Sequence, residues 1–270
     1  MSKRLPQPRL ERISVLTILV LLTYGLIRMI ELPTVAFEAA ILGLLIEVDF
    51  ETQSLFLILA AALAAAGTNW LIMGHPYSKY VRHVENWVIP TFAAVAIGVF
   101  VIRIPPGPFL WLGVVLGALL LVIVFTAEFI VSFPRDPRYE LVAIGLNGLA
   151  FLLLAAAFFA IFALQLRAIF AIPLVFVATF LITWRLLRLS YPDVRLWLWA
   201  LIIAVIAAQI ATGLHYLPLV PLRVSLLLGV TVYLSYQFIL SHLRRELKLG
   251  ILVEYIVVGM ISLVAIFTLT

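Results

Sequence analysis

The chain has 270 residues, of which 65% are apolar and 11% charged, with a formal net charge of +5 and no cysteine. A soluble globular domain is roughly one-half apolar and one-quarter charged, so this composition leaves too little polar surface for a particle in water. It excludes ordinary soluble enzymes, disordered chains and disulfide-stapled scaffolds. The missing thiols also exclude cysteine-based zinc and iron–sulfur sites. We therefore expect an integral membrane protein.

Nine apolar runs each have about the length, roughly 20 residues, that an α-helix needs to cross a bilayer. Short segments with Pro, Gly and charged residues separate the runs, so neighbouring helices are expected to pack antiparallel. The predicted fold class is an all-α polytopic membrane protein, with a single transmembrane domain over residues 1–270. The predicted spans are Ile13–Ile30, Ser54–Met73, Trp87–Arg103, Phe109–Val131, Leu141–Leu164, Ala168–Arg188, Leu196–Tyr216, Pro221–His242 and Gly250–Leu269.

The basic residues predict how the chain is oriented. Fourteen of the 18 Lys and Arg residues fall in one set of alternating loops, which includes the N-terminal segment 1–12, and four fall in the other set. Loops rich in Lys and Arg stay in the cytoplasm, so we expect a cytoplasmic N-terminus, an outer C-terminus and a place in the bacterial inner membrane. The same distribution argues against a nucleic-acid partner. No cleavage site follows the first span, which is expected to remain as a signal anchor.

One apolar stretch, Thr34–Glu51, does not fit a tenth span. It carries Glu38, Glu47 and Asp49, whose burial in lipid would be costly. Its apolar residues alternate with a period of two, which is typical of a half-buried β-strand. We expect a small extracytoplasmic β-hairpin within the segment 31–53, with an irregular or helical interfacial segment as the alternative.

Five polar residues within the spans lie at a similar depth, near the predicted cytoplasmic helix ends: Glu128, Glu254, Asn147, Asn69 and Gln237. Ionisable groups inside a membrane are candidates for function. If these helices adjoin, the five residues could line a vestibule in which the carboxylates bind protons or cations, as in a transporter or channel. The alternative is structural: a Glu near a helix end reaches the headgroups or pairs with Arg, and amides bond between helices.

A second polar group lies at the predicted outer ends of the spans. Its members are Arg28, Arg103, Arg167, Arg223, His215 and Tyr216. Arginine binds carboxylate or phosphate with two parallel hydrogen bonds. The group is therefore a candidate site for an anionic headgroup, or for the lipid substrate of a lipid-modifying enzyme. The alternative is a set of Arg–Glu pairs that anchor the hairpin, together with ordinary headgroup contacts.

The motifs of common cofactor and metal sites are missing. His75 and His83 share one loop, and His242 and His215 lie at opposite membrane sides, so no facing pair for a haem is predicted. The chain has no HExxH, P-loop, dinucleotide fingerprint or Gly-x-Ser-x-Gly. We expect no cofactor and no metal, and we favour a non-catalytic accessory or scaffold subunit. Its expected partners are membrane lipids, a pigment, a membrane protein or a second copy of the chain.

Small residues predict where helices approach one another closely. The fourth span contains a GxxxG pattern, Gly113 to Gly117, and the second span carries the small-residue run Ala60–Gly67. Both patterns allow helix backbones to come together. With nine spans in one chain, packing within the molecule is the expected use, and a partner helix is the alternative.

Four short segments carry a resemblance to a known family. They are IleLeuGly at 41–43, AlaGlyThrAsnTrp at 66–70, GlyLeuHisTyrLeuProLeu at 213–219 and LeuValGluTyr at 252–255. In these segments the chain resembles an uncharacterised family of bacterial polytopic membrane proteins. The resemblance implies a shared fold over most of the chain and no particular chemistry, so it assigns no functional residues.

Overall fold

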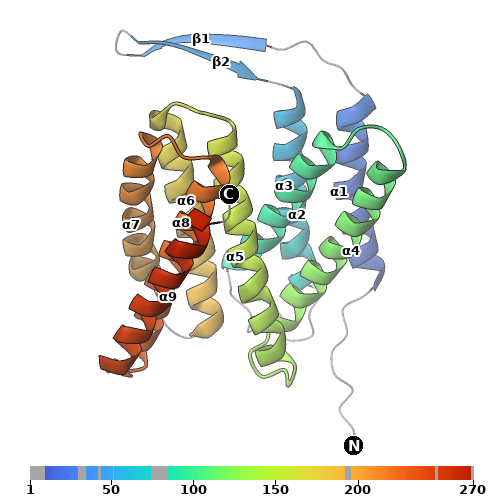
Figure 1. Cartoon of the computed structure of the whole chain (residues 1–270). Helices are drawn as coiled ribbons and strands as arrows, with labels where there is room; N and C mark the ends of the chain where they lie inside the picture. Colours follow the sequence, from blue (N-terminus) through green and yellow to red (C-terminus); the bar gives the residue numbers. More distant parts are fainter. Residues whose placement is uncertain are drawn as a thin grey trace, which may run out of the picture. The chain divides into compact units, whose positions relative to one another are not determined.

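A computed structural model describes residues 10–29, 35–41, 44–50, 52–73, 84–191, 196–246 and 249–268. The chain divides into two compact units, Met1–Val142 and Ala143–Thr270. Within the described residues, nine α-helices and one pair of strands follow one another along the chain (Figure 1). The helices are α1 (Leu10–Met29), α2 (Thr52–Met73), α3 (Val88–Arg103), α4 (Pro108–Val131), α5 (Tyr139–Ala163), α6 (Ala168–Ser190), α7 (Trp197–His215), α8 (Pro221–Leu243) and α9 (Leu249–Thr268), with a 3₁₀ turn, η2 (Val84–Trp87), before α3.

The helices coincide with the nine predicted spans to within three residues at each end. In the described part of the chain, eight of them, α1 to α8, are long and apolar enough to cross a membrane. The apolar segment recognised in α9, Val253–Thr268, is shorter. The helices therefore define a multi-pass membrane protein, as the composition predicted. The orientation of the spans stays a prediction.

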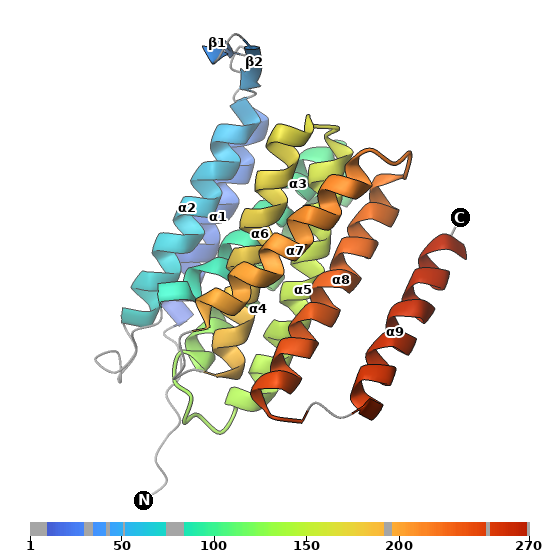
Figure 2. The same ribbon diagram turned by 90° about the vertical axis from the view of Figure 1, so that its left-hand side faces the viewer.

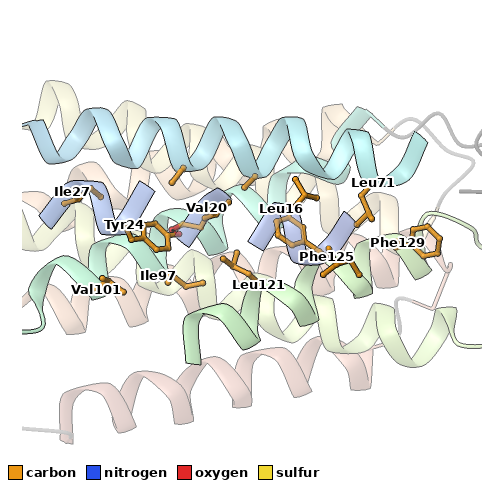
Figure 3. Packing of buried hydrophobic residues seen from close by; sticks show 14 residues of the cluster. Leu16, Val20, Tyr24, Ile27, Leu71, Ile97, Val101, Leu121, Phe125 and Phe129 are labelled. Atoms are coloured by element: carbon orange, nitrogen blue, oxygen red, sulfur yellow. The ribbon is translucent and has the colours of Figure 1, made fainter. Parts of the chain in front are cut away.

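Helices α1 to α4 of the first unit pack against one another around one apolar core. Helix α1 buries Ile13, Leu16, Val20, Tyr24 and Ile27, which are spaced three or four residues apart and so lie on one helix face. The opposite face exposes Val15, Ile18, Leu19 and Leu22, which are equally apolar, because lipid is the solvent on that side. The labelled residues of the core are Leu16, Val20, Tyr24, Ile27, Leu71, Ile97, Val101, Leu121, Phe125 and Phe129 (Figure 3).

Glycines determine how closely these helices approach. A Cβ atom on Gly117 would lie 2.6 Å from Cγ2 of Ile97, and one on Gly113 would lie 2.8 Å from Cδ1 of Ile104. The GxxxG pattern of α4 therefore packs against α3 and its C-cap, which confirms the expected use inside the molecule. Gly67, at the end of the small-residue run in α2, likewise makes room for Leu16 of α1.

Many hydroxyl groups within the helices are bonded to nearby carbonyl groups. Thr68 donates to the carbonyl oxygen of Ala64 at 2.7 Å, one helical turn earlier. The hydroxyl of Tyr24 donates to the carbonyl oxygen of Ala94 at 2.5 Å and so joins α1 to α3. Such internal bonds are needed because hydrocarbon offers no hydrogen-bond partner.

Between α1 and α2 the backbone forms two strands, β1 (Val35–Ile41) and β2 (Leu44–Phe50) (Figure 1). They pair antiparallel, with Val35 opposite Phe50 and Ile41 opposite Leu44. Residues 30–34, 42–43 and 51 of the predicted hairpin segment lie outside the described residues. Its place outside the membrane and against the helices stays a prediction.

In the second unit, helices α6 to α9 pack in chain order, each against the next. Figure 2 shows α9 beside α8 at the edge of this unit. Helix α5 meets α8 through Phe151, whose ring makes edge contacts with Tyr233 and Tyr236 at centroid distances of 5.5 Å. The order of packing brings the α5–α6 loop close to the α7–α8 loop, and the candidate site lies there.

We expect Gly117→Val to destabilise the first unit. The added side chain would press on Ile97, and overpacking of this kind costs about 1–3 kcal/mol. The matched control is Gly145→Val in α5, since a Cβ at that position meets nothing within 4 Å. Unfolding in mixed detergent micelles, followed by helical circular dichroism, measures both variants. Equal stability of the two would show that the α3–α4 contact is not close.

We expect single cysteines to report the predicted orientation, because the natural chain has none. In sealed right-side-out vesicles, Tyr216→Cys in the α7–α8 loop should react with a membrane-impermeant maleimide. Pro134→Cys in the α4–α5 loop should react only after the vesicles are opened. Both positions are exposed, so access to the reagent is decided by the membrane side alone. The opposite labelling pattern would reverse the topology.

Candidate functional site

A pocket of about 340 Å³ lies in the second unit between the α5–α6 loop and the α7–α8 loop. Its lining includes three polar side chains, Gln165, Arg167 and His215. The remaining lining residues are apolar, and they are Phe162, Leu166, Leu214, Leu217, Leu219, Pro221 and Val224. We call this hollow the headgroup pocket. No carboxylate is among its lining residues, so its charge is positive or neutral.

Two helices begin at the headgroup pocket. Helix α6 begins directly after Arg167, and α8 begins at Pro221. Neither helix has a side chain that caps its N-terminus. Helix α8 begins with Pro221, which has no backbone N–H, and the N–H groups of Phe170 and Arg223 donate to the carbonyl oxygens of Arg167 and Val220. The helix dipole nevertheless makes the N-terminal end of each helix attractive to anions. Together with Arg167 and His215, these two helix ends suit an anionic group.

Two nitrogen atoms at this end of the unit are buried without a hydrogen-bond partner among the described residues. They are Nδ1 of His215 and Nε of Arg223. Arg223 lies over the ring of Phe267 at 5.8 Å, and the ring of His215 is 6.2 Å from that of Phe162. A buried polar atom without a partner costs roughly 1–3 kcal/mol, so a bound oxygen that accepts from these nitrogens would be favoured.

The backbone at Gln165 is strained. Its φ is +48°, in the left-handed region that favours glycine, and its N–H donates to the carbonyl oxygen of Phe162 at 3.2 Å. Strain of this kind gathers at functional sites and is held by the surrounding structure. Here it places the one amide side chain of the headgroup pocket.

The structure brings together part of the predicted outer group. Arg167 and His215 line the same pocket, and Arg223 lies on the first turn of α8 beside it. Tyr216 is exposed and stands edge-on to His215, with a centroid distance of 5.6 Å. Arg103 is exposed in the first unit and does not line this pocket. The side chain of Arg28 lies outside the described residues.

The two predicted carboxylates have opposite surroundings. Glu128 is fully buried in α4 of the first unit, where its side chain makes contacts with other residues. Glu254 is exposed on α9 of the second unit, and Asn69 is exposed on α2 of the first. Asn147 is half-buried on α5. A role for these four residues in ion binding stays a prediction.

Gln237 takes part in a chain of hydrogen bonds that joins α8 to α9. Its side-chain amide donates to the hydroxyl of Tyr233 of the same helix at 3.2 Å, and its backbone carbonyl oxygen accepts from the hydroxyl of Tyr255 of α9 at 3.2 Å. The same Tyr255 hydroxyl is 2.6 Å from Oγ of Ser241. These bonds fit the structural alternative, in which polar groups hold helices together. The sequence indicated Glu254 as the polar residue of this span and did not indicate that the neighbouring Tyr255 bonds to α8.

A tight ion pair closes the turn between α4 and α5. Asp136 is buried and accepts from Nε and NH2 of Arg138 at 3.0 and 2.9 Å, and from the backbone N–H of Arg138 at 2.9 Å. The hydrogen bond to Asp136 raises the pKa of Arg138, so this guanidinium stays charged. Arg185 of α6 and Glu85 of η2 are also buried.

Within the described residues, no group of three or more His, Cys, Asp or Glu side chains could hold a metal ion. His75 and His83 lie outside the described residues. The ring of His242 packs against Trp199 at 5.6 Å.

The fold defines a multi-pass helical membrane protein, and its second unit carries a pocket lined by Arg167 and His215. Residues 32–269 match the family described as Protein of unknown function (DUF5656), and the chain belongs to that family. This confirms the resemblance to an uncharacterised family. Neither a curated protein nor a solved structure matches the chain.

We expect Gln165→Gly to make the protein more stable. Glycine adopts positive φ without strain, so the free energy of unfolding should rise by about 1 kcal/mol. The matched control is Gln209→Gly within α7, where the same change should lower stability by a similar amount. Detergent-induced unfolding measures both. A loss of stability at both positions would mean that Gln165 is not strained.

Proposed function

We propose that this protein is a non-catalytic lipid-binding protein of the cytoplasmic membrane. Its headgroup pocket binds the anionic headgroup of a membrane phospholipid. The observation that carries the proposal is the joint presence of Arg167, His215 and two uncapped helix N-termini in one pocket without a carboxylate. A phosphate group offers oxygen acceptors to the two side chains and carries the negative charge that a helix N-terminus favours.

The shape of the pocket also favours an amphiphile over a free ion. Phe162, Leu214 and Leu217 make most of one wall apolar, next to the polar side chains. An inorganic ion would leave this apolar surface uncovered, whereas the glycerol backbone and first methylenes of a lipid would cover it. Helices α5 and α7 end at the pocket, and helices α6 and α8 begin there. If these helices span the bilayer, the pocket lies at the depth of the lipid headgroups.

A binding role is favoured over turnover by the residues of the pocket. Its lining contains no Ser, Thr or carboxylate that could act as a nucleophile beside His215. The same pocket would suit an accessory subunit that presents or retains a lipid. A pigment or a partner protein is not needed to account for it.

We expect the double variant Arg167→Gln, His215→Gln to lose its preference for anionic lipid. A hydrogen bond to a charged group contributes about 1.5–3 kcal/mol, so losing even one lowers affinity roughly tenfold or more. The measurement is the number of lipids retained in native mass spectrometry, after equilibration in nanodiscs of phosphatidylglycerol or of phosphatidylcholine.

Arg135→Gln is the control, because it removes one exposed positive charge from the α4–α5 loop and leaves the pocket unchanged. It should keep the preference of the natural protein. Adding millimolar inorganic phosphate to the same assay distinguishes a lipid headgroup from a free phosphate ion as the ligand. If the added phosphate displaces the lipid completely, the pocket recognises the free ion. Equal retention of both lipids by the natural protein would contradict the proposal.

A further inference from the structure

Helices α8 and α9 line a long, partly open apolar hollow. It consists of a cavity of about 400 Å³ among α7, α8 and α9, and one of about 310 Å³ between α8 and α9. Both cavities are lined by Leu234 of α8 and Ile256 of α9, so they adjoin. We call the combined hollow the chain groove. Figure 2 shows the two helices side by side along their lengths.

The chain groove has the length of a lipid tail. On α8 its lining runs from Leu227 to Ile239, which corresponds to about 18 Å of helix at 1.5 Å per residue. One leaflet contributes about half of the roughly 30 Å hydrocarbon core. The groove is therefore long enough for the acyl chain of one lipid.

The groove begins next to the headgroup pocket. Val224 lines that pocket, and Leu227, one turn further along the same face of α8, lines the groove. Arg223, on the same turn, lies over Phe267 of α9, the neighbour of the groove residue Ile266. The cationic side chain of Arg223 thus lies between the headgroup pocket and the groove, where the headgroup of a bound lipid would join its acyl chain.

We infer that the chain groove holds one acyl chain of the phospholipid whose headgroup occupies the headgroup pocket; this inference rests on the proposed function. A partner helix is about 10–12 Å across and does not fit between α8 and α9, which already pack against each other. A hydrocarbon chain is one carbon wide and does fit. Charge complementarity between a lipid phosphate and Arg167, His215 and Arg223 fixes which end of the groove takes the headgroup.

Gly259 of α9 lines the groove and lies directly against Leu234 of α8. A Cβ atom there would lie 3.2 Å from Cδ1 of Leu234, the residue that both cavities share. A larger side chain at position 259 would therefore fill the groove where its two parts join. Gly250, at the start of α9, meets nothing within 4 Å and provides the matched position outside the groove.

The test uses phosphatidylglycerol with a diazirine at the middle of one acyl chain, incorporated into nanodiscs with the full-length protein. After irradiation, mass spectrometry locates the crosslinked residues. We expect adducts on the α8 and α9 residues of the groove. Gly259→Leu should reduce them at least fivefold, and Gly250→Leu should leave them unchanged. Circular dichroism establishes that both variants remain folded; should Gly259→Leu unfold, Gly259→Ala takes its place with a smaller expected loss.

The headgroup preference, measured on the same samples, separates this inference from the proposed function. If phosphatidylglycerol is still preferred but the adducts lie outside α8 and α9, or persist in Gly259→Leu, the groove does not hold the chain and the inference fails. If the groove is labelled equally by phosphatidylcholine analogues, the proposed headgroup function fails instead. Crosslinks to a second copy of the protein in place of lipid would also overturn the inference.

Discussion

The hydrocarbon core of a bilayer offers no hydrogen-bond partner, and the structure of this protein follows from that condition. All backbone groups within the spans must pair internally, which leaves the α-helix as the form of every described span. Many side-chain hydroxyl groups in the spans also donate hydrogen bonds to groups within the protein. Thr68 bonds one turn back in its own helix, and Tyr24 reaches a carbonyl group of the neighbouring α3. Tyr255 and Gln237 join α9 to α8 in the same way.

The packing of the helices depends more on the size of the side chains than on their polarity. Exposed and buried faces of α1 are both apolar, because lipid and the protein interior are similar solvents. The close contacts occur where a side chain is missing: Gly113 and Gly117 accept side chains next to them, and Gly67 makes room for Leu16. Gly259 likewise accepts Leu234 of α8 beside it, and it lines the hollow between α8 and α9 that we infer holds a lipid chain.

The polar groups of the candidate site lie where helices begin and end. A helix N-terminus exposes N–H groups, and the loops beside it can carry Arg and His without placing a charge in hydrocarbon. In the second unit two such ends meet, and the strained Gln165, Arg167 and His215 surround the space between them. The proposed headgroup site and the chain groove share the first turns of α8, so one amphiphile can satisfy both.

The sequence alone determined the helical class and the bounds of all nine helices to within three residues, because an apolar run of bilayer length has few other uses. It also indicated the outer arginines and His215 as candidates. Only the tertiary structure decided which of them meet: Arg167 joins His215 in one pocket, and Arg103 belongs to the other unit. Residues at a similar depth in the membrane can belong to helices that do not touch. Which helices pack together depends on how their small and large side chains fit, and a sequence whose helices are apolar on every face does not reveal this fit.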